Sequence, residues 1–123
     1  AIFDKYSEIK QPEWDRQGIA AAVPEMNRGL PRFLDDVTRL DRIAFTAEEG
    51  VLLYDYALVH KDASPVDNGE IGDPKAVRAG LLQEYCSPPM KVFRERGIPV
   101  RHRFHRGDRP FGDYLLSPGD CPA

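Results

Sequence analysis

The stretch LDRIAFT (40–46), AEEG (47–50) and VLLYDYALVH (51–60) decides the fold. Its two outer segments are rich in β-branched and aromatic residues, and the short polar segment between them ends in glycine, as hairpin loops often do. A four-residue loop places Thr46 opposite Val51 and so sets the register. The expected pairs on one face are Phe45 with Leu52, Ile43 with Tyr54 and Asp41 with Tyr56, and those on the other face are Arg42 with Asp55 and Ala44 with Leu53.

The first of these faces holds most of the aromatic and aliphatic side chains, so we expect it to face the core. The second strand is apolar on both sides, which predicts an interior position in a sheet.

A second hairpin is expected near the C-terminus. Ile98 to Arg106 forms one strand, Gly107-Asp108 forms a two-residue turn, and Arg109 to Leu116 forms the returning strand. The expected pairs are Phe104 with Phe111, His102 with Asp113 and Val100 with Leu115, while Arg101, Arg103 and His105 lie on the opposite face with Tyr114 across from Arg101.

Helical segments precede and separate the two hairpins. Residues 12–28 predict a helix that Pro24 kinks or splits. Asp73 and Pro74 predict the capped start of another helix, and Ser87-Pro88 restarts a short one that ends at Gly97. The order predicts an α+β fold with an N-terminal helix, an antiparallel hairpin, a helical segment and a second antiparallel hairpin. We expect the helices to pack on one face of the sheet.

Length and composition predict one folded domain spanning residues 1–123. The chain is 41% hydrophobic and 30% charged, which fits a globular protein, and it lacks the roughly 18 consecutive apolar residues of a membrane span. The net charge of −3 argues against general nucleic-acid binding. Seven basic and two acidic residues lie between Lys91 and Arg109, so this segment carries about +5 and the remainder about −8.

The two cysteines, Cys86 and Cys121, leave two alternatives, a pair of buried thiols or a disulfide. We favour the disulfide, because Cys121 lies in a Pro- and Gly-rich tail that would otherwise have no anchor. A disulfide indicates an oxidising compartment. A first residue Ala1 fits a mature protein whose signal peptide has been removed, and it fits a trimmed chain equally well.

The spacing of several motifs resembles that of small exported bacterial proteins, periplasmic or lipoprotein-like, whose activity is not established. The resemblance spans about Leu30 to Cys121, and it implies an envelope location and a paired disulfide but no mechanism. The residues that carry it are Thr38-Arg39-Leu40-Asp41, Tyr54-x-Tyr56-x-Leu58-Val59, Tyr85-Cys86, Met90, Gly97 and Asp120-Cys121.

The candidate binding residues are Arg101, Arg103, His105 and Tyr114. Alternation along a strand places the first three on one face, where Arg can bind acidic groups in bidentate geometry. The alternative is a solvated strand whose charges only protect a sheet edge.

Chemistry at the histidines is the less favoured alternative. His102 opposite Asp113 would form an acid–base pair, but no nucleophile motif accompanies it. His102 and His105 should point to opposite faces of a strand, which argues against a shared metal site. We therefore expect neither catalytic residues, nor a metal, nor a cofactor.

These observations predict a small non-enzymatic binding protein, periplasmic or secreted, whose partner is a protein or another anionic molecule. Three alternatives stay open: an inhibitor or immunity-type protein acting on a toxin or hydrolase, a small enzyme that uses the His102 and Asp113 pair, and a structural subunit of an envelope complex that uses an aromatic face for contact.

Overall fold

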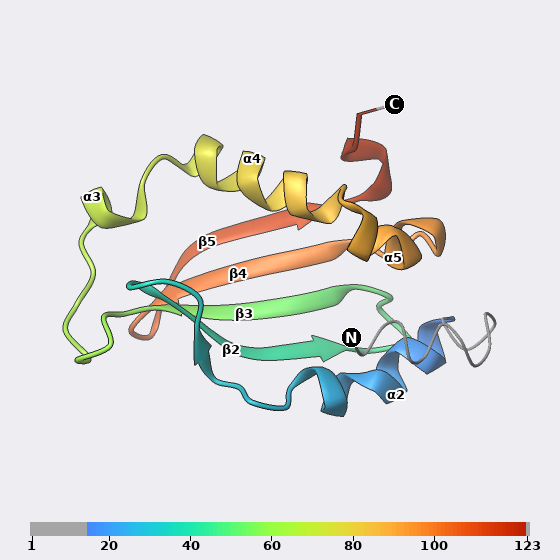
Figure 1. The fold of residues 1–123 in the computed structure, drawn as a ribbon, viewed down its shortest axis with the longest axis horizontal. Coiled ribbons are helices and arrows are strands. Elements are labelled where there is room, and N and C mark those ends of the chain that lie inside the picture. The colour runs from blue at the N-terminus through green and yellow to red at the C-terminus, as the bar shows by residue number, and fades with distance from the viewer. Residues whose placement is uncertain (1–14, 123) are drawn as a thin grey trace.

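This computed structural model describes residues 15–122, which form an α+β fold (Figure 1). The strands form one five-stranded sheet in the order β1-β2-β3-β4-β5. The elements are α2 (Arg16–Met26), β1 (Arg32–Phe33), β2 (Thr38–Phe45), β3 (Leu52–Leu58), α3 (Asn68–Ile71), α4 (Pro74–Tyr85), the 3-10 turn η2 (Pro88–Met90), α5 (Lys91–Glu95), β4 (Val100–Arg106), β5 (Arg109–Leu116) and the 3-10 turn η3 (Pro118–Asp120).

Two antiparallel hairpins meet at the centre of the sheet. β2 pairs with β3 and β4 pairs with β5, as the sequence predicts, and the two hairpins join where β3 runs parallel to β4. The parallel join requires a long connection, which α3, α4 and α5 provide. β3 is therefore an interior strand, which confirms the expectation drawn from its apolar residues.

The register of the first hairpin is confirmed over most of its length, with Phe45 opposite Leu52 and Arg42 opposite Asp55. The predicted pairing of Asp41 with Tyr56 is wrong. A register shift between Leu40 and Arg42 makes Asp41 an extra residue, and Leu40 lies opposite Tyr56 instead. The shift turns the carboxylate of Asp41 toward Arg39 and leaves Leu40 buried in the core.

In the second hairpin the turn is confirmed, because Arg106 pairs with Arg109 around Gly107-Asp108. The pairs beyond it are wrong by one residue, since a register shift between Phe104 and His105 makes Phe111 the extra residue. The observed pairs are Phe104 with Gly112, Arg103 with Asp113, His102 with Tyr114, Arg101 with Leu115 and Val100 with Leu116. The shift places Leu116 in the core and Asp113 on the opposite face.

The helices cover one face of the sheet, where Ile19 of α2, Tyr85 of α4 and Phe93 of α5 share a buried cluster with the strands. Figure 1 shows α2 along the β2 side and α4 along the β5 side. α2 continues through Pro24 to Met26, so of the two expected effects of Pro24, a kink or a split, the split is wrong. Residues 12–14 of the predicted helix lie outside the described residues.

The predicted disulfide is confirmed. It joins Cys86, at the C-terminal cap of α4, to Cys121, just after η3, and holds the C-terminal segment against the helical layer. At the other end of α4, the side chain of Asp73 accepts from the backbone N–H of Lys75, and Pro74 occupies the first turn as expected. Between residues 15 and 122, no helix is both long and apolar enough to span a membrane.

Candidate functional site

The predicted basic face of β4 is present, but its charges are paired. Arg101 donates to both carboxylate oxygens of Asp113 at 2.8 and 2.5 Å, and this bond holds the pKa of Asp113 below its usual value. The pair lies at the surface, with both side chains nearly half exposed.

The neighbouring residues extend this pattern across three strands. Asp55 accepts from Arg42 at 2.7 Å and lies 3.5 Å from the Nε of Arg103, while the Nε2 of His105 lies 3.7 Å from Asp41. On the sheet face opposite the helices, acidic and basic side chains therefore alternate and pair with one another. An acidic partner would have to compete with the carboxylates that are already paired with Arg101 and Arg103.

Two of the predicted placements are wrong because of the shift at Phe111. Tyr114 lies opposite His102 rather than Arg101, and its ring contacts Phe104 edge-on on the helix-covered face. His102 does not face Asp113. It is buried on the helix-covered side, 2.7 Å from the hydroxyl of Tyr56, and burial lowers its pKa to about 4. The His102 and Asp113 pair, on which the less favoured alternative of an enzyme depends, is absent.

A second candidate site lies between α4 and the sheet. It is a groove of about 350 Å³ that opens on the helix-covered face. Tyr56, Phe104 and Tyr114 line it from three adjacent strands. Leu81 lines it from α4, Leu34 from the segment after β1, and α3 borders it with Ile71.

The aromatic residues of the groove support one another. The rings of Tyr56 and Phe104 stack with centroids 4.5 Å apart, and Phe104 meets Tyr114 edge-on at 5.9 Å. Gly112 makes room for this arrangement, because a Cβ there would lie 3.1 Å from the Tyr114 ring. The aromatic surface is thus held in place by its own packing before any partner arrives.

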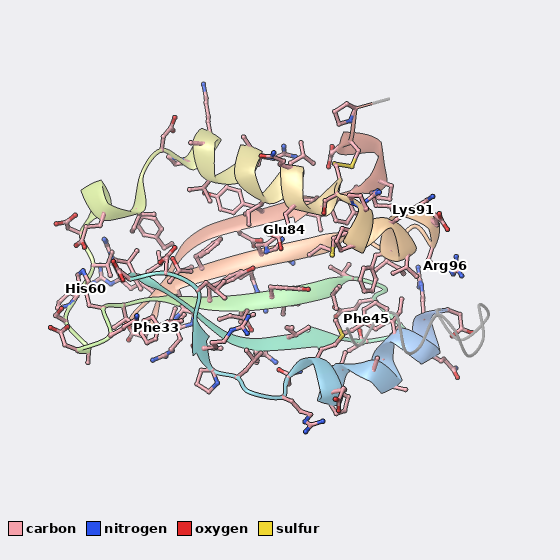
Figure 2. The ribbon with its side chains drawn as sticks, viewed as in Figure 1. Phe33, Phe45, His60, Glu84, Lys91 and Arg96 are labelled. Carbon is pink, nitrogen blue, oxygen red and sulfur yellow. A yellow bond between two sulfur atoms is a disulfide. The ribbon has the colours of Figure 1, made fainter. Side chains whose placement is uncertain are left out.

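α4 presents a narrow surface to the groove. Ala76, Gly80 and Glu84, spaced four apart on one side of the helix, all line it. A Cβ at Gly80 would meet no atom within 4 Å, so packing does not require glycine there. Its missing side chain leaves open space. Figure 2 labels Glu84 on the side of α4 that lies toward the strands.

The charged side chains that line the groove are all acidic. Asp35, Glu70 and Glu84 line it, and no lysine, arginine or histidine from the described part of the chain does so. Negative charge from Glu84 adds to burial in raising the pKa of Tyr54 to about 12. The groove is thus an apolar surface bordered by carboxylates.

Sequence reasoning missed this groove. Its residues come from the segment after β1, from β2 through β5, and from α3 and α4, and no local spacing brings them together. The one signal that could have pointed to it is Gly80 in the middle of a predicted helix, since glycine weakens a helix interior by roughly 1 kcal/mol relative to alanine.

Comparisons with known proteins find the fold in solved structures. No protein-family model matches the sequence, and no curated protein matches it. A Pseudomonas aeruginosa protein considered to be secreted matches with a TM-score of 0.71 at 17% identity, covering 93% of this chain and 97% of that one. The type 2 secretion pilotin EpsS from Vibrio vulnificus matches with a TM-score of 0.66 at 14% identity, covering 91% and 98%.

A third structure, the type 2 secretion pilotin AspS from Vibrio cholerae, matches with a TM-score of 0.60 at 10% identity, covering 90% of this chain and 94% of that one. The chain shares the fold of these pilotins. The match runs over nearly the full length of each structure, so the shared fold includes both hairpins and the helices between them. It also agrees with the resemblance to small exported bacterial proteins.

Proposed function

We propose that this chain is a small exported protein of the bacterial envelope that binds a segment of a protein partner, without catalysis, in the groove between α4 and the sheet. Two of the structures that share its fold are pilotins of type 2 secretion systems, which supports a pilotin-like role. The observation that carries the proposal is the groove itself, with apolar side chains left at its border.

Leu34 and Phe111 are the apolar border residues. Their exposed fractions are 48% and 39%, and both line the groove. Single exposed apolar residues are common on protein surfaces, but two of them beside one aromatic groove form a continuous surface that a partner could cover.

Charge complementarity supports one kind of occupant. Glu84 has no hydrogen bond or ion pair to any other side chain among residues 15–122, and Asp35 uses its carboxylate only to accept backbone N–H groups. A segment that inserts apolar side chains and carries lysine or arginine beside them would satisfy both the aromatic floor and these carboxylates.

The small residues of α4 favour a helical occupant. Ala76 and Gly80 are one turn apart and allow another helix to approach α4 closely, whereas larger side chains at these positions would hold it off. An amphipathic helix that lays its apolar face into a groove is a common form of peptide recognition. The proposed partner segment is therefore a basic amphipathic helix.

Synthetic peptides test the proposal. One peptide carries a leucine stripe flanked by lysines, and a second carries glutamates in place of the lysines. We expect the lysine peptide to bind at least about tenfold more tightly by fluorescence anisotropy, because the groove carboxylates attract one and repel the other. Equal affinity of the two peptides, or no binding of either, would contradict the proposal.

A matched pair of variants locates the binding. Leu34→Ser removes an apolar residue from the groove border, and Leu115→Ser removes one that is 50% exposed and lies opposite Arg101 on the other face of the sheet. We expect only Leu34→Ser to weaken the lysine peptide. An equal loss in both variants would show that the peptide adheres to apolar surface without using the groove.

A further inference from the structure

The short helix α3 borders the groove but has little packing of its own. Glu70 and Ile71 line the groove, yet none of its four residues is buried. The side chains of Asp67 and Glu70 cap its first turn, which keeps the helix formed but does not attach it to the sheet. Two side chains, one at the end of β4 and one in the segment after β3, hold this segment in place.

The first is Arg106, at the end of β4. One of its guanidinium nitrogens donates to the backbone carbonyl of Val66 at 3.2 Å and to the Oδ1 of Asn68 at 2.7 Å. The guanidinium also lies 4.9 Å from the ring centroid of Phe111, a residue of the groove border. Arginine keeps its charge at all physiological pH values, so this attachment does not depend on pH.

The second is His60, which follows β3. Its Nε2 lies 2.5 Å from Glu70, and its Nδ1 lies 2.9 Å from the hydroxyl and 3.2 Å from the carbonyl oxygen of Ser64. The hydroxyl of Ser64 donates its own proton to Asp62 at 2.6 Å, so toward His60 it can only accept. Every partner of the imidazole is therefore an acceptor.

This set of partners favours the protonated form of the ring. A neutral imidazole has one N–H and can donate to Glu70 or to Ser64 but not to both, whereas the imidazolium donates to both. The charged groups that face His60 are Glu70 and Asp62, and both favour the cation. The bond to Glu70 accordingly raises the pKa of His60 above 6.5. The adjacent Lys61 turns away, toward the ring of Phe33.

We propose that α3 is a movable end of the groove, held against it by the protonated side chain of His60. When His60 loses its proton, one of its two attachments is lost and Glu70 loses its cation. The attachment through His60 is then weaker, while Arg106 and the buried side chain of Val66 still hold the start of the segment, so α3 moves away from the groove border. The consequence for binding rests on the function proposed above: the groove should bind its occupant with higher affinity at low pH.

An NMR titration between pH 5.5 and 8.5 tests the movement without any ligand. We expect the ring signals of His60 to titrate with a midpoint above 6.5, and the methyl signals of Ile71 to shift with the same midpoint. In His60→Gln the Ile71 signals should stay constant over this range. His105→Gln is the control, because the ring of His105 pairs with Asp41 and the carbonyl of Gly107 rather than with α3, so its removal should leave the Ile71 titration unchanged.

Two results would overturn the proposal. One is an Ile71 signal that stays constant while His60 titrates, and the other is an Ile71 titration that persists in His60→Gln. Arg106→Gln adds a positive check, since removal of the pH-independent attachment should enlarge the shift of Ile71 as His60 loses its proton.

The lysine peptide then measures the consequence for binding. We expect its affinity to fall about fivefold or more between pH 5.5 and 8.5 in the natural chain and to change less in His60→Gln. A peptide that fails to bind at every pH contradicts the proposed function but leaves the Ile71 titration standing. A peptide that binds with the same affinity at both pH values contradicts this inference alone.

Discussion

The side chain of Asn27 completes the edge of the sheet beside Ile43. Its Nδ2 donates to the carbonyl of Ile43 at 2.7 Å, and its Oδ1 accepts from the N–H of Ile43 at 2.9 Å. The same Nδ2 also donates to the carbonyl of Val23 in α2 at 2.9 Å. One amide thus replaces a missing neighbouring strand, since β1 pairs with β2 only at Leu40 and Arg39, and it ties α2 to the sheet.

Replacing Asn27 with leucine should destabilise the protein by about 1–3 kcal/mol, because both backbone groups of Ile43 lose their partner in a partly buried position. Asn27→Asp keeps the acceptor and loses the donor, so we expect an intermediate loss. Urea unfolding monitored by circular dichroism measures both variants. A leucine variant as stable as the natural chain would show that water replaces the amide at no cost.

The fold could largely be read from the sequence, because hairpins are local. Turn residues and alternating apolar residues fix which strands pair, as at Phe45 with Leu52. The two register shifts could not be foreseen, since each depends on which side chain the finished core accepts. Leu40 and Leu116 lie in the core, and the regular strand pairing is interrupted at Asp41 and at Phe111 instead. The parallel pairing of β3 with β4 depends on contacts between segments far apart in sequence.

His102 should make stability depend on pH in acid. It is buried and its pKa in the folded protein is about 4, against 6.5 for a free histidine. Between these two pKa values, His102 is therefore protonated in the unfolded chain but neutral in the folded protein. The resulting stability is fully present above pH 6.5 and is lost as the pH falls toward 4, by about 3 kcal/mol for a shift of this size.

Urea unfolding at pH 7 and pH 4 measures this loss, with His102→Gln as the comparison that removes the titrating group. We expect the natural chain to lose more stability than the variant over this interval. His60 does not produce this loss, because its effect on stability has the opposite sign and lies at higher pH. Its raised pKa stabilises the fold below pH 6.5, and this stability is lost as the pH rises above 6.5. Equal losses in the natural chain and in His102→Gln would disprove the role of His102.

Glycine at position 80 should lower the stability of the protein but leave room in the groove for a partner. Gly80→Ala is expected to stabilise α4 by roughly 1 kcal/mol, because alanine favours helix and its Cβ meets no other atom. Gly80→Leu should fill the groove and abolish binding of the lysine peptide while the protein stays folded. Ala79→Leu, at the preceding position of the helix and outside the groove lining, is the matched control. Tight binding by Gly80→Leu would mean that the peptide lies elsewhere.

The Arg101 and Arg103 face remains a predicted binding surface, and charge reversal tests it against the groove. Because both cations are already paired with Asp113 and Asp55, we expect Arg101→Glu with Arg103→Glu to leave the affinity for the glutamate peptide, the acidic partner that this face would attract, within about threefold at 0.15 M salt. The measurement is fluorescence anisotropy on the folded double variant. A loss of tenfold or more would assign the binding to this face, with His105 beside it.

The candidate site was less accessible to sequence reasoning than the fold. Alternation correctly placed Arg101 and Arg103 on one face, but it could not show that Asp113 and Asp55 would pair with them. The groove required knowledge of where α4 lies over the sheet. The α3 attachment is local in part, since His60 and Ser64 are close in sequence, but the partner Glu70 becomes adjacent only when the loop folds back.

The position of the bound peptide tests the central claim most directly. Chemical-shift mapping and intermolecular NOEs with the lysine peptide should locate contacts at the methyl groups of Leu34, Ile71 and Leu81 and at the ring of Phe111. The methyl groups of Leu115, on the opposite face, should show none. NOEs confined to Leu115 and its neighbours, with the groove signals unchanged, would contradict the account.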